Sequence, residues 1–215
     1  FRTFIERAWQ VQTDCRIEYV LFFKNHGRNA GASLVHPHAQ MVALPMVPNE
    51  VRVRADEARH HFDEVGRCAF CEMIEQELQS KTRLILETKH FIAFTPYASV
   101  APVHIWVVPK AHLSSFLHAQ DDELADLGVV MHQVLRKLYL GLNNPDYNYA
   151  IRTAPVSDLG AAYLHWYITI VPRISYAAGF EIGSGIYINP SLPEECAEFL
   201  RQVDDQTPGD LPPDE

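Results

Sequence analysis

The chain has 215 residues, of which 47% are hydrophobic, so it can bury a core in one large domain or two small ones. Its formal net charge of −9 and its isoelectric point near 5.6 argue against a general nucleic-acid surface. No apolar run in these residues is long enough to cross a membrane, and we expect no signal peptide. Four cysteines in a chain of this length are not typical of a disulfide framework, which favours a reducing, cytoplasmic location.

Apolar periodicity and turn residues predict helices and strands along the whole chain. Helices are predicted over residues 1–12, 49–66, 69–79, 121–142 and 190–203. Strands are predicted over residues 17–23, 41–45, 83–87, 91–95, 103–109, 147–152 and 163–171. Residues 177–189 are rich in glycine and predicted to be irregular. Pro, Gly and Asp in residues 204–215 predict a disordered tail.

The chain is organised around residues 25–40, which join a loop of small residues to an alternating polar run. Side chains of an extended segment repeat every two residues, so His36, His38 and Gln40 would share one face. The loop before them can point backbone N–H groups at an anion. Two imidazoles and a carboxamide beside such a loop predict phosphate chemistry. The alternative is an exposed strand that carries two polar histidines.

An internal repeat relates this stretch to a later one. The repeat aligns residues 19–23 with 147–151, and residues 31–38 with 160–167. In this alignment His36 matches His165, and His38 matches Tyr167. The second copy therefore keeps the first histidine and loses the second. We interpret the kept histidine as structural and the lost one as catalytic.

Cys68 and Cys71 have the spacing of two zinc ligands. A redox pair or two buried thiols would have the same spacing. His112, at the exit of a predicted strand, and His165, the kept histidine of the repeat, would complete a tetrahedral Zn²⁺ site. Such a site has no open position and would be structural. Two other histidines are alternatives to His112, namely His90 and His104.

These motifs resemble those of the galactose-1-phosphate uridylyltransferase family, within the histidine-triad superfamily. Residues 25–40 are similar to the active-site signature of that family, and the second half of the chain is similar to its C-terminal lobe. The nearest likeness is to the ADP-glucose phosphorylase-like branch. The segments that carry this likeness are Cys68-x-x-Cys71, residues 109–112, His165-Trp166 and residues 179–190.

The resemblance implies an α+β fold of two histidine-triad-like lobes, each an antiparallel sheet with packed helices. Residues 1–66 would form part of an N-terminal lobe with the His-Pro-His motif, and residues 67–203 a C-terminal lobe with the zinc site. The first helix begins abruptly at Phe1, so we expect the first lobe to be incomplete and an upstream portion to be missing. We expect a homodimer, or pairing with that missing N-terminal part.

The resemblance also implies roles for individual residues. His38 would be the nucleophile that takes a nucleotide from a nucleoside diphosphate sugar and releases a sugar 1-phosphate, and Gln40 would bind the phosphoryl oxygens. His36 would be a ligand of a first zinc site whose other ligands lie upstream. Cys68, Cys71, His112 and His165 would bind Zn²⁺. The residues expected to bind substrate are Asn25, Gly31, Ser33 and, unless it is only a solvated loop carboxylate, Glu181.

Two positions depart from the uridylyltransferases proper. Those enzymes carry a histidine where this chain has Tyr167, and a glutamine where it offers Tyr187 or Asn189. Both changes favour a glucose 1-phosphate, an ADP-sugar or phosphorolysis over galactose 1-phosphate. Lys110 and Arg152 could contact phosphate, but we predict a surface role for each.

The predicted function is nucleotidyl transfer between nucleoside diphosphate sugars and hexose 1-phosphates or phosphate, with Zn²⁺ as cofactor and no nucleic-acid or membrane partner. Two alternatives are a histidine-triad nucleotide hydrolase and a zinc-stabilised nucleotide-binding subunit. Simple hydrolases of that superfamily are single short lobes, so the internal repeat and the cysteine pair argue against the first alternative.

Overall fold

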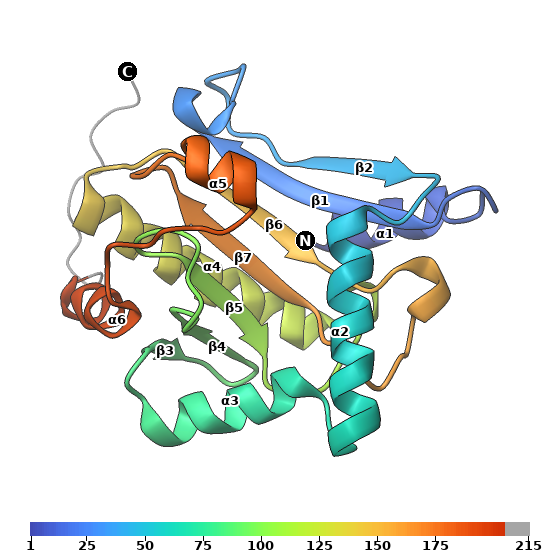
Figure 1. Cartoon of the computed structure of the whole chain (residues 1–215). Helices are drawn as coiled ribbons and strands as arrows, with labels where there is room; N and C mark the ends of the chain where they lie inside the picture. Colours follow the sequence, from blue (N-terminus) through green and yellow to red (C-terminus); the bar gives the residue numbers. More distant parts are fainter. Residues whose placement is uncertain (205–215) are drawn as a thin grey trace.

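Seven strands form one antiparallel sheet in the computed structural model, which describes residues 1–204 (Figure 1). In spatial order they are β2 (Gln40–Leu44), β1 (Tyr19–His26), β6 (Tyr147–Arg152), β7 (Tyr167–Pro172), β5 (Ile105–Pro109), β4 (Phe91–Phe94) and β3 (Leu84–Glu87). Strand β1 pairs with β2 on one side and with β6 on the other, so strands from both halves of the chain share the sheet. The predicted α+β class is confirmed.

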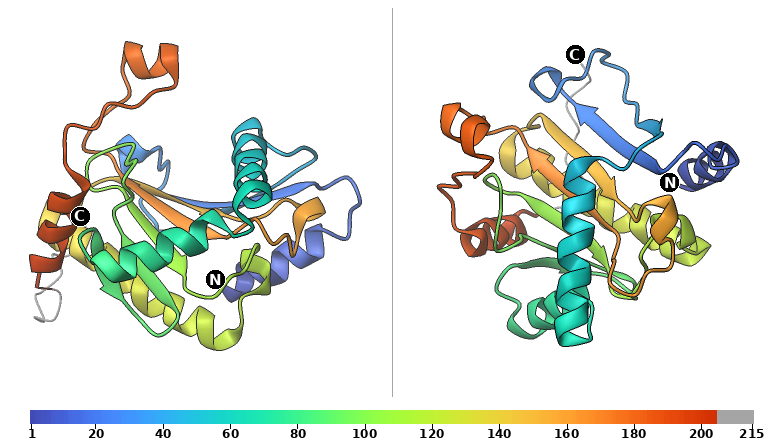
Figure 2. Two further views of the ribbon diagram at one scale, coloured as in Figure 1. Left: turned by 60° about the horizontal axis from the view of Figure 1, so that its bottom comes forward. Right: turned by 45° about the vertical axis from the view of Figure 1, so that its right-hand side comes forward.

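Helices lie on both faces of this sheet (Figure 1). Their bounds are α1 (Arg2–Val11), α2 (Asn49–Val65), α3 (Ala69–Ser80), α4 (Asp121–Leu142), α5 (Gly179–Ser184) and α6 (Pro193–Gln202). Short 3-10 turns cover Arg28–Ala30, Phe116–His118 and Val156–Asp158. Helices α1, α4 and α6 pack on one face, and α2 and α3 lie over the other (Figure 2). None of the helices within residues 1–204 is long and apolar enough to cross a bilayer.

The alternation of side chains along each strand decides which layer they reach. Phe22, Ile151 and Ile168 are fully buried in the core beneath α1, α4 and α6. Helix α4 meets them with apolar residues at helical spacing, namely Leu127, Val130, Val134 and Leu138. Strand residues between these positions face α2 and α3 instead. Asn25 and Arg152 belong to this second face, which therefore carries the polar side chains.

The predicted helices and strands agree with most of the structure, and one departure concerns the histidine segment. The chain bends at Val35 and His36, and β2 begins only at Gln40. The condition under which His36, His38 and Gln40 would share one face, an extended run from His36 to Gln40, is therefore not met at His36. Pro37 supplies the physical reason, because it lacks an N–H for a strand ladder and restricts the backbone of the residue before it.

Three further differences lie in the second half. Strand β7 begins at Tyr167, later than predicted. A short helix, α5, forms within the stretch predicted to be irregular, because Glu181 Oε2 accepts the backbone N–H of Ala178 and caps its first turn. Helix α6 begins at Pro193, where proline suits a first helical turn. The predicted disordered tail lies outside the described residues, apart from Asp204.

The segment around α5 projects away from the rest of the chain (Figure 2). Its apolar side chains are exposed, and Ile182 keeps 78% of its surface accessible. The other exposed apolar residues of this segment are Ile174, Tyr176, Phe180, Ile186, Tyr187, Ile188 and Leu192. Clusters of this kind mark contacts with other protein segments. The expected homodimer, or pairing with an N-terminal part, stays a prediction.

The β3 edge of the sheet is irregular and covered. The register of β3 shifts between Leu84 and Leu86, where the strand carries a bulge. Arg201 of α6 donates from its guanidinium to the backbone carbonyls of Thr82 and Leu84. A side chain of α6 therefore occupies carbonyls that β3 would otherwise present to solvent.

Replacing Phe22 with alanine tests the core beneath α4. The ring of Phe22 is fully buried and lies 5.5 Å from the ring of Phe116, centroid to centroid. We expect Phe22→Ala to lower the free energy of unfolding by about 3–5 kcal/mol, because it leaves a cavity in a packed core. The matched control, Phe180→Ala in α5, should stay within about 0.5 kcal/mol of the parent because that ring is exposed. Equal effects in urea titrations would contradict this account of the core.

Candidate active site and metal cluster

Residues 27–31 form a tight turn that connects β1 to the histidine segment. Gly27 and Gly31 have φ angles of 83° and 85°, which side chains other than glycine rarely adopt. A Cβ atom on Gly27 would lie 1.7 Å from Asp146 Oδ1, so no larger residue fits there. The backbone N–H groups of residues 29–32 all donate within the chain. Asn29 donates to the carboxylate of Asp146, and the other three amides donate to backbone carbonyls. That loop amides face a substrate anion stays a prediction.

Hydrogen bonds hold this loop against the second repeat. Asp146 Oδ2 accepts the backbone N–H of Asn29 at 2.6 Å. Asn148 Nδ2 donates to Asn25 Oδ1 at 2.7 Å and to the carbonyl of Ala30 at 2.8 Å. Asn25 and Asn148 are direct partners in the β1–β6 register. The Asn25 oxygen is thus occupied, and its amide nitrogen is the atom left to donate to a ligand.

His38 is held in one tautomer by the backbone. Its Nδ1 lies 2.9 Å from the carbonyl oxygen of His36. Because a carbonyl can only accept, Nδ1 carries the proton and Nε2 of the neutral ring keeps its lone pair. The ring is half-buried, and Gln40 follows it as the half-buried first residue of β2. The segment therefore presents an imidazole nitrogen that can attack an electrophile.

The remaining predicted site residues, Ser33, His36 and Glu181, lie outside the cluster that could bind a metal. Ser33 and His36 are exposed. Within residues 1–204, the one cluster with metal-binding geometry does not include His36. Glu181 is half-buried and caps α5, and hydrogen bonds from backbone amides lower the pKa of its carboxyl group. The expected roles of these residues in binding substrate or a first metal stay predictions.

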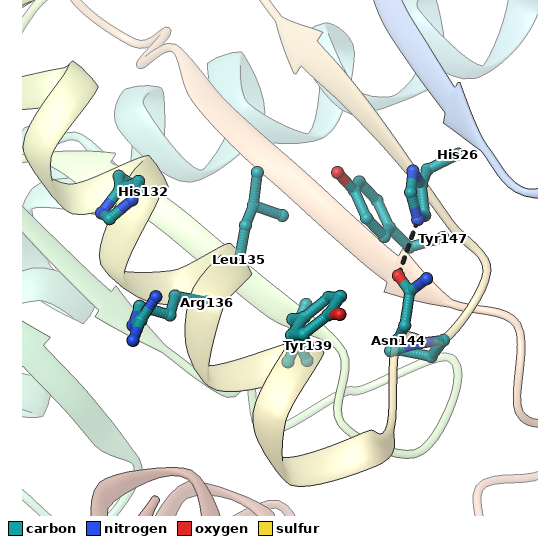
Figure 3. Close-up of a pocket in the computed structure, with 9 residues that line it drawn as sticks. His26, His132, Leu135, Arg136, Tyr139, Asn144 and Tyr147 are labelled. Atoms are coloured by element: carbon teal, nitrogen blue, oxygen red, sulfur yellow. Dashed lines mark hydrogen bonds between the residues drawn. The ribbon is translucent and has the colours of Figure 1, made fainter. Parts of the chain in front are cut away.

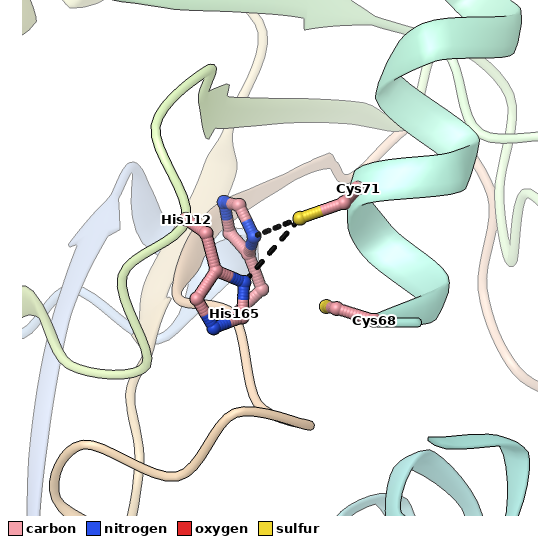
Figure 4. Close-up of side chains that lie close together, drawn as sticks. All are labelled: Cys68, Cys71, His112 and His165. Atoms are coloured by element: carbon pink, nitrogen blue, oxygen red, sulfur yellow. Dashed lines mark hydrogen bonds between the residues drawn. The ribbon is translucent and has the colours of Figure 1, made fainter. Parts of the chain in front are cut away.

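Cys68, Cys71, His112 and His165 converge in space, as Figure 4 shows. Their ligand atoms all lie within 4.8 Å of one another. Cys71 Sγ is 3.3 Å from His112 Nδ1 and 3.7 Å from His165 Nδ1. The thiols come from the start of α3, and the histidines follow β5 and precede β7. Four such donors in one cluster could hold a metal ion.

The surroundings of this cluster orient His165, which is buried with Cys68, whereas Cys71 is half-buried and His112 is exposed. His165 Nε2 donates to the carbonyl oxygen of Pro109 at 3.0 Å, which leaves Nδ1 unprotonated beside Cys71. Burial lowers the pKa of His165 to about 4, and burial with the neighbouring Cys68 raises the pKa of Cys71 to about 12. A bound cation would oppose the second shift by stabilising the thiolate.

The two alternative histidines make other contacts. His90 lies 3.2 Å from a carboxylate oxygen of Asp122. His104 Nε2 lies 2.7 Å from Thr169 Oγ1, inside the sheet face that α2 and α3 cover. Neither belongs to the cluster, so His112 is the histidine that joins His165.

A hollow of about 230 Å³ lies beneath the start of the loop, between α4 and the end of β1 (Figure 3). His26 stacks on Tyr147 with ring centroids 4.7 Å apart, and its Nε2 lies 2.9 Å from Asn144 Oδ1. Asp146, which accepts the Asn29 amide, lies in the same turn as Asn144. These contacts support the loop from behind.

The two cations weighed between phosphate contact and a surface role, Lys110 and Arg152, are both half-exposed. Arg152, predicted to lie on the surface, is only half-exposed, and its Nε is buried without a hydrogen-bond partner within residues 1–204. Lys110 is held by Glu87 Oε1 and the carbonyl of Thr88. The alternation of β6 could have given the signal, because Arg152 shares a face with Asn148.

Comparison with known proteins places these features in a family. The family described as "Domain of unknown function (DUF4921)" matches residues 6–205. The chain is 42% identical over 200 residues to ADP-glucose phosphorylase of Arabidopsis thaliana, covering 92% of this chain and 56% of that protein. The chain belongs to this family, which is galactose-1-phosphate uridylyltransferase-like.

Two further comparisons agree with this membership. Galactose-1-phosphate uridylyltransferase of Thermotoga maritima is 29% identical over 93% of this chain and 65% of its own length. The crystal structure of an Arabidopsis thaliana ADP-glucose phosphorylase with bound ADP-glucose superposes with a TM-score of 0.86 at 41% identity, covering 94% of this chain and 64% of that one. The chain thus spans about 56–65% of the length of these curated relatives.

The acid sensitivity of the protein tests the burial of His104. Its side chain is 4% exposed, and burial, helped by the nearby Arg54 and Arg152, lowers its pKa from 6.5 to about 4. As the pH falls, His104 is therefore protonated at a higher pH in the unfolded chain than in the folded chain. Stability present above pH 6.5 should fall between pH 6.5 and 4, with a share from His104 of about 3 kcal/mol.

Urea titrations of the parent and of His104→Gln across this range would measure that share. The variant should show a flatter pH dependence, whereas His165, which titrates in the same range, is present in both proteins. Identical slopes would show that His104 is not the group that loses stability.

Proposed function

We propose that the protein transfers a nucleoside monophosphate from a nucleoside diphosphate sugar to a second phosphate, through a covalent intermediate on His38. The observation that carries this proposal is the hydrogen bond from His38 Nδ1 to the carbonyl of His36, which leaves Nε2 unprotonated. Imidazole suits such a reaction because it attacks well near neutral pH and also leaves well.

Each half-reaction exchanges one bond at phosphorus. In the first, the Nε2 lone pair forms a bond to the α-phosphorus, and the bond to the bridging oxygen breaks, so that a sugar 1-phosphate leaves with that electron pair. In the second, an oxygen of an incoming phosphate or hexose 1-phosphate attacks the same phosphorus, and the N–P bond breaks. The proton on Nδ1 stays in place throughout, and the carbonyl of His36 stabilises the positive ring of the intermediate.

Neighbouring residues would hold the phosphates during transfer. We assign Gln40, two residues after His38, to the phosphoryl oxygens, because a positioned amide donor stabilises charge that develops in the transition state. Asn25 Nδ2 would donate to the same group from β1, with Gly31 allowing close approach and Ser33 donating its hydroxyl. Glu181 would bind sugar hydroxyls, and His36 would ligate a first metal.

The relatives support a substrate class. One is named ADP-glucose phosphorylase, and others are named galactose-1-phosphate uridylyltransferase. The higher identity to the first favours an ADP-sugar as donor and phosphate as acceptor. The free thiols of the four cysteines favour a reducing compartment, so we also propose a cytoplasmic location.

We further propose that the cysteine–histidine cluster holds Zn²⁺ as a structural ion. With zinc–sulfur and zinc–nitrogen distances of about 2.3 and 2.0–2.1 Å, a tetrahedral ion places sulfur and nitrogen ligands about 3.5 Å apart. The distances from Cys71 Sγ to the two histidine nitrogens, 3.3 and 3.7 Å, lie on either side of that value. Such an ion would tie α3 to the strands β5 and β7.

Covalent loading tests the nucleotidyl-transfer mechanism. Incubation with ADP-glucose should increase the intact mass by one AMP group, and peptide mapping should place that group on His38. His38→Asn should abolish the adduct and lower turnover by about 10³-fold or more, because the nucleophile is lost. The matched control, His60→Asn on the exposed surface of α2, should react like the parent.

Two results would decide against this mechanism. One is turnover of the His38→Asn variant at the rate of the parent. The other is an adduct that water removes as fast without phosphate as with it, which would favour a hydrolase.

Metal analysis tests the proposed zinc site. The purified protein should contain one zinc ion per chain, and Cys71→Ser should lose it, because one thiolate ligand is missing. If free zinc at about 1,000 times its Kd stabilises the parent, the gain should be about 4 kcal/mol in thermal unfolding. The exposed Cys15 provides the matched control, and Cys15→Ser should keep both the metal and the stability. Zinc retained by Cys71→Ser would place the metal elsewhere.

A further inference from the structure

A cavity of about 380 Å³ lies under α2 and α3, against the polar face of the sheet. Its volume falls within the range of about 300–1,000 Å³ that is usual for small-ligand sites. The walls come from α2, α3, the strands β1, β5, β6 and β7, and the loop after β6. Figure 1 shows α2 crossing this end of the sheet. The cavity adjoins the metal cluster through His165, and none of residues 25–40 lines it.

One side of the cavity is aromatic. The rings of Phe70, Trp106 and Tyr167 contact one another, with centroids 5.7 Å apart for Phe70 and Trp106 and 4.6 Å for Trp106 and Tyr167. Phe70 and Trp106 are only partly buried. Apolar side chains of α2 and α3, such as Val51 and Met73, continue this wall. A planar ring would find stacking partners here.

The other side carries hydrogen-bond donors without partners. The hydroxyl of Tyr19, a residue only 1% exposed, has no acceptor for its proton within residues 1–204, although the backbone of Thr153 interacts with its oxygen. Arg152 Nε has no acceptor there either. Arg54 reaches across from α2 and donates to the hydroxyl of Tyr167 at 2.7 Å. The lining holds these two guanidinium groups against one carboxylate, Glu57. Buried donors beside excess positive charge favour an anionic group.

The internal repeat indicates which class of molecule would combine a planar ring with an anionic group. His165 and Tyr167 line the cavity, and they match His36 and His38 of the first repeat. Position 169, which matches Gln40, holds a threonine whose hydroxyl lies against His104. The cavity is therefore lined by the two second-repeat residues that match His36 and His38 of the proposed nucleotide site. A tyrosine stands where the nucleophile would be.

We propose that this cavity is a second, non-reacting site for an aromatic anion of the nucleoside monophosphate class. The ring would stack against Trp106, and the phosphate would accept from Arg152 and Tyr19. The choice of a nucleotide rests on the proposed function, whereas the choice of an aromatic anion rests on the cavity alone. Because Tyr167 replaces the histidine, the bound nucleotide would form no covalent bond.

Calorimetric titrations with AMP and with adenosine test this site, using the chain with His38→Asn so that the first repeat cannot react. We expect saturable binding of AMP and a change in Trp106 fluorescence that Trp106→Phe removes. AMP should bind about tenfold or more tightly than adenosine, because hydrogen bonds to its charged phosphate are lost without it. Adding Arg152→Met should remove that difference.

Two further variants test the site if Arg152→Met does not fold. Tyr19→Phe removes one hydroxyl whose proton has no acceptor, so it should weaken AMP binding several-fold without lowering the unfolding temperature. Arg52→Met, on the exposed side of α2 and outside the cavity lining, is the matched control and should leave both affinities unchanged.

The proposal is overturned if AMP gives no saturable binding, or if its advantage over adenosine survives both Arg152→Met and Tyr19→Phe. Loss of binding in Gln40→Ala but not in Arg152→Met would place AMP at the first repeat and would also overturn it. These outcomes are independent of the proposed function, because an adduct on His38 of the parent is measured separately.

Discussion

The structure depends on the antiparallel pairing of β1 with β6. This ladder runs from Phe22 opposite Ile151 to His26 opposite Tyr147, and it joins the two repeats in one sheet. A shift of one residue would send every side chain of β1 to the other face. The present register buries Phe22 under α4 and places Asn25 opposite Asn148 on the polar face. The position of the loop that precedes the histidines follows from that pairing.

The two repeats use one kind of hydrogen bond for different purposes. In each, one nitrogen of a histidine ring donates to a backbone carbonyl, and this fixes which nitrogen keeps its lone pair. His38 donates from Nδ1 to His36, so Nε2 is available. His165 donates from Nε2 to Pro109, so Nδ1 faces the cysteines. The first arrangement suits a nucleophile and the second suits a metal ligand.

Periodicity predicted the fold well where one face of an element is apolar. The 22 residues of α4 were identified with the bounds that the structure has. The convergence of Cys68, Cys71, His112 and His165 was also predicted, because ligand spacing and the repeat both pointed to it. These features are encoded locally, in runs of neighbouring residues or in spacings that recur.

The features that sequence reasoning missed are partly local and partly dependent on tertiary contacts. The bend before His38 follows from Pro37, and the cap of α5 depends on one carboxylate reaching back to Ala178. The amide of Asn29 is occupied because the chain folds back on itself and places Asp146 beside it, whereas the next three amides donate to carbonyls of the same turn. The sequence predicted a surface role for Arg152 because the residues around it come from other strands and from α2. No short window of sequence contains those neighbours.

The guanidinium of Arg201 has a consequence for how the sheet can grow. A foreign strand joins a sheet by bonding to the free backbone groups of its outermost strand. At the β3 margin, Arg201 already occupies the carbonyls of Thr82 and Leu84, and the bulge twists the backbone away from a flat template. Pairing of a strand from another chain with β3 is therefore disfavoured. Such pairing would begin at β2, the other edge strand of the sheet.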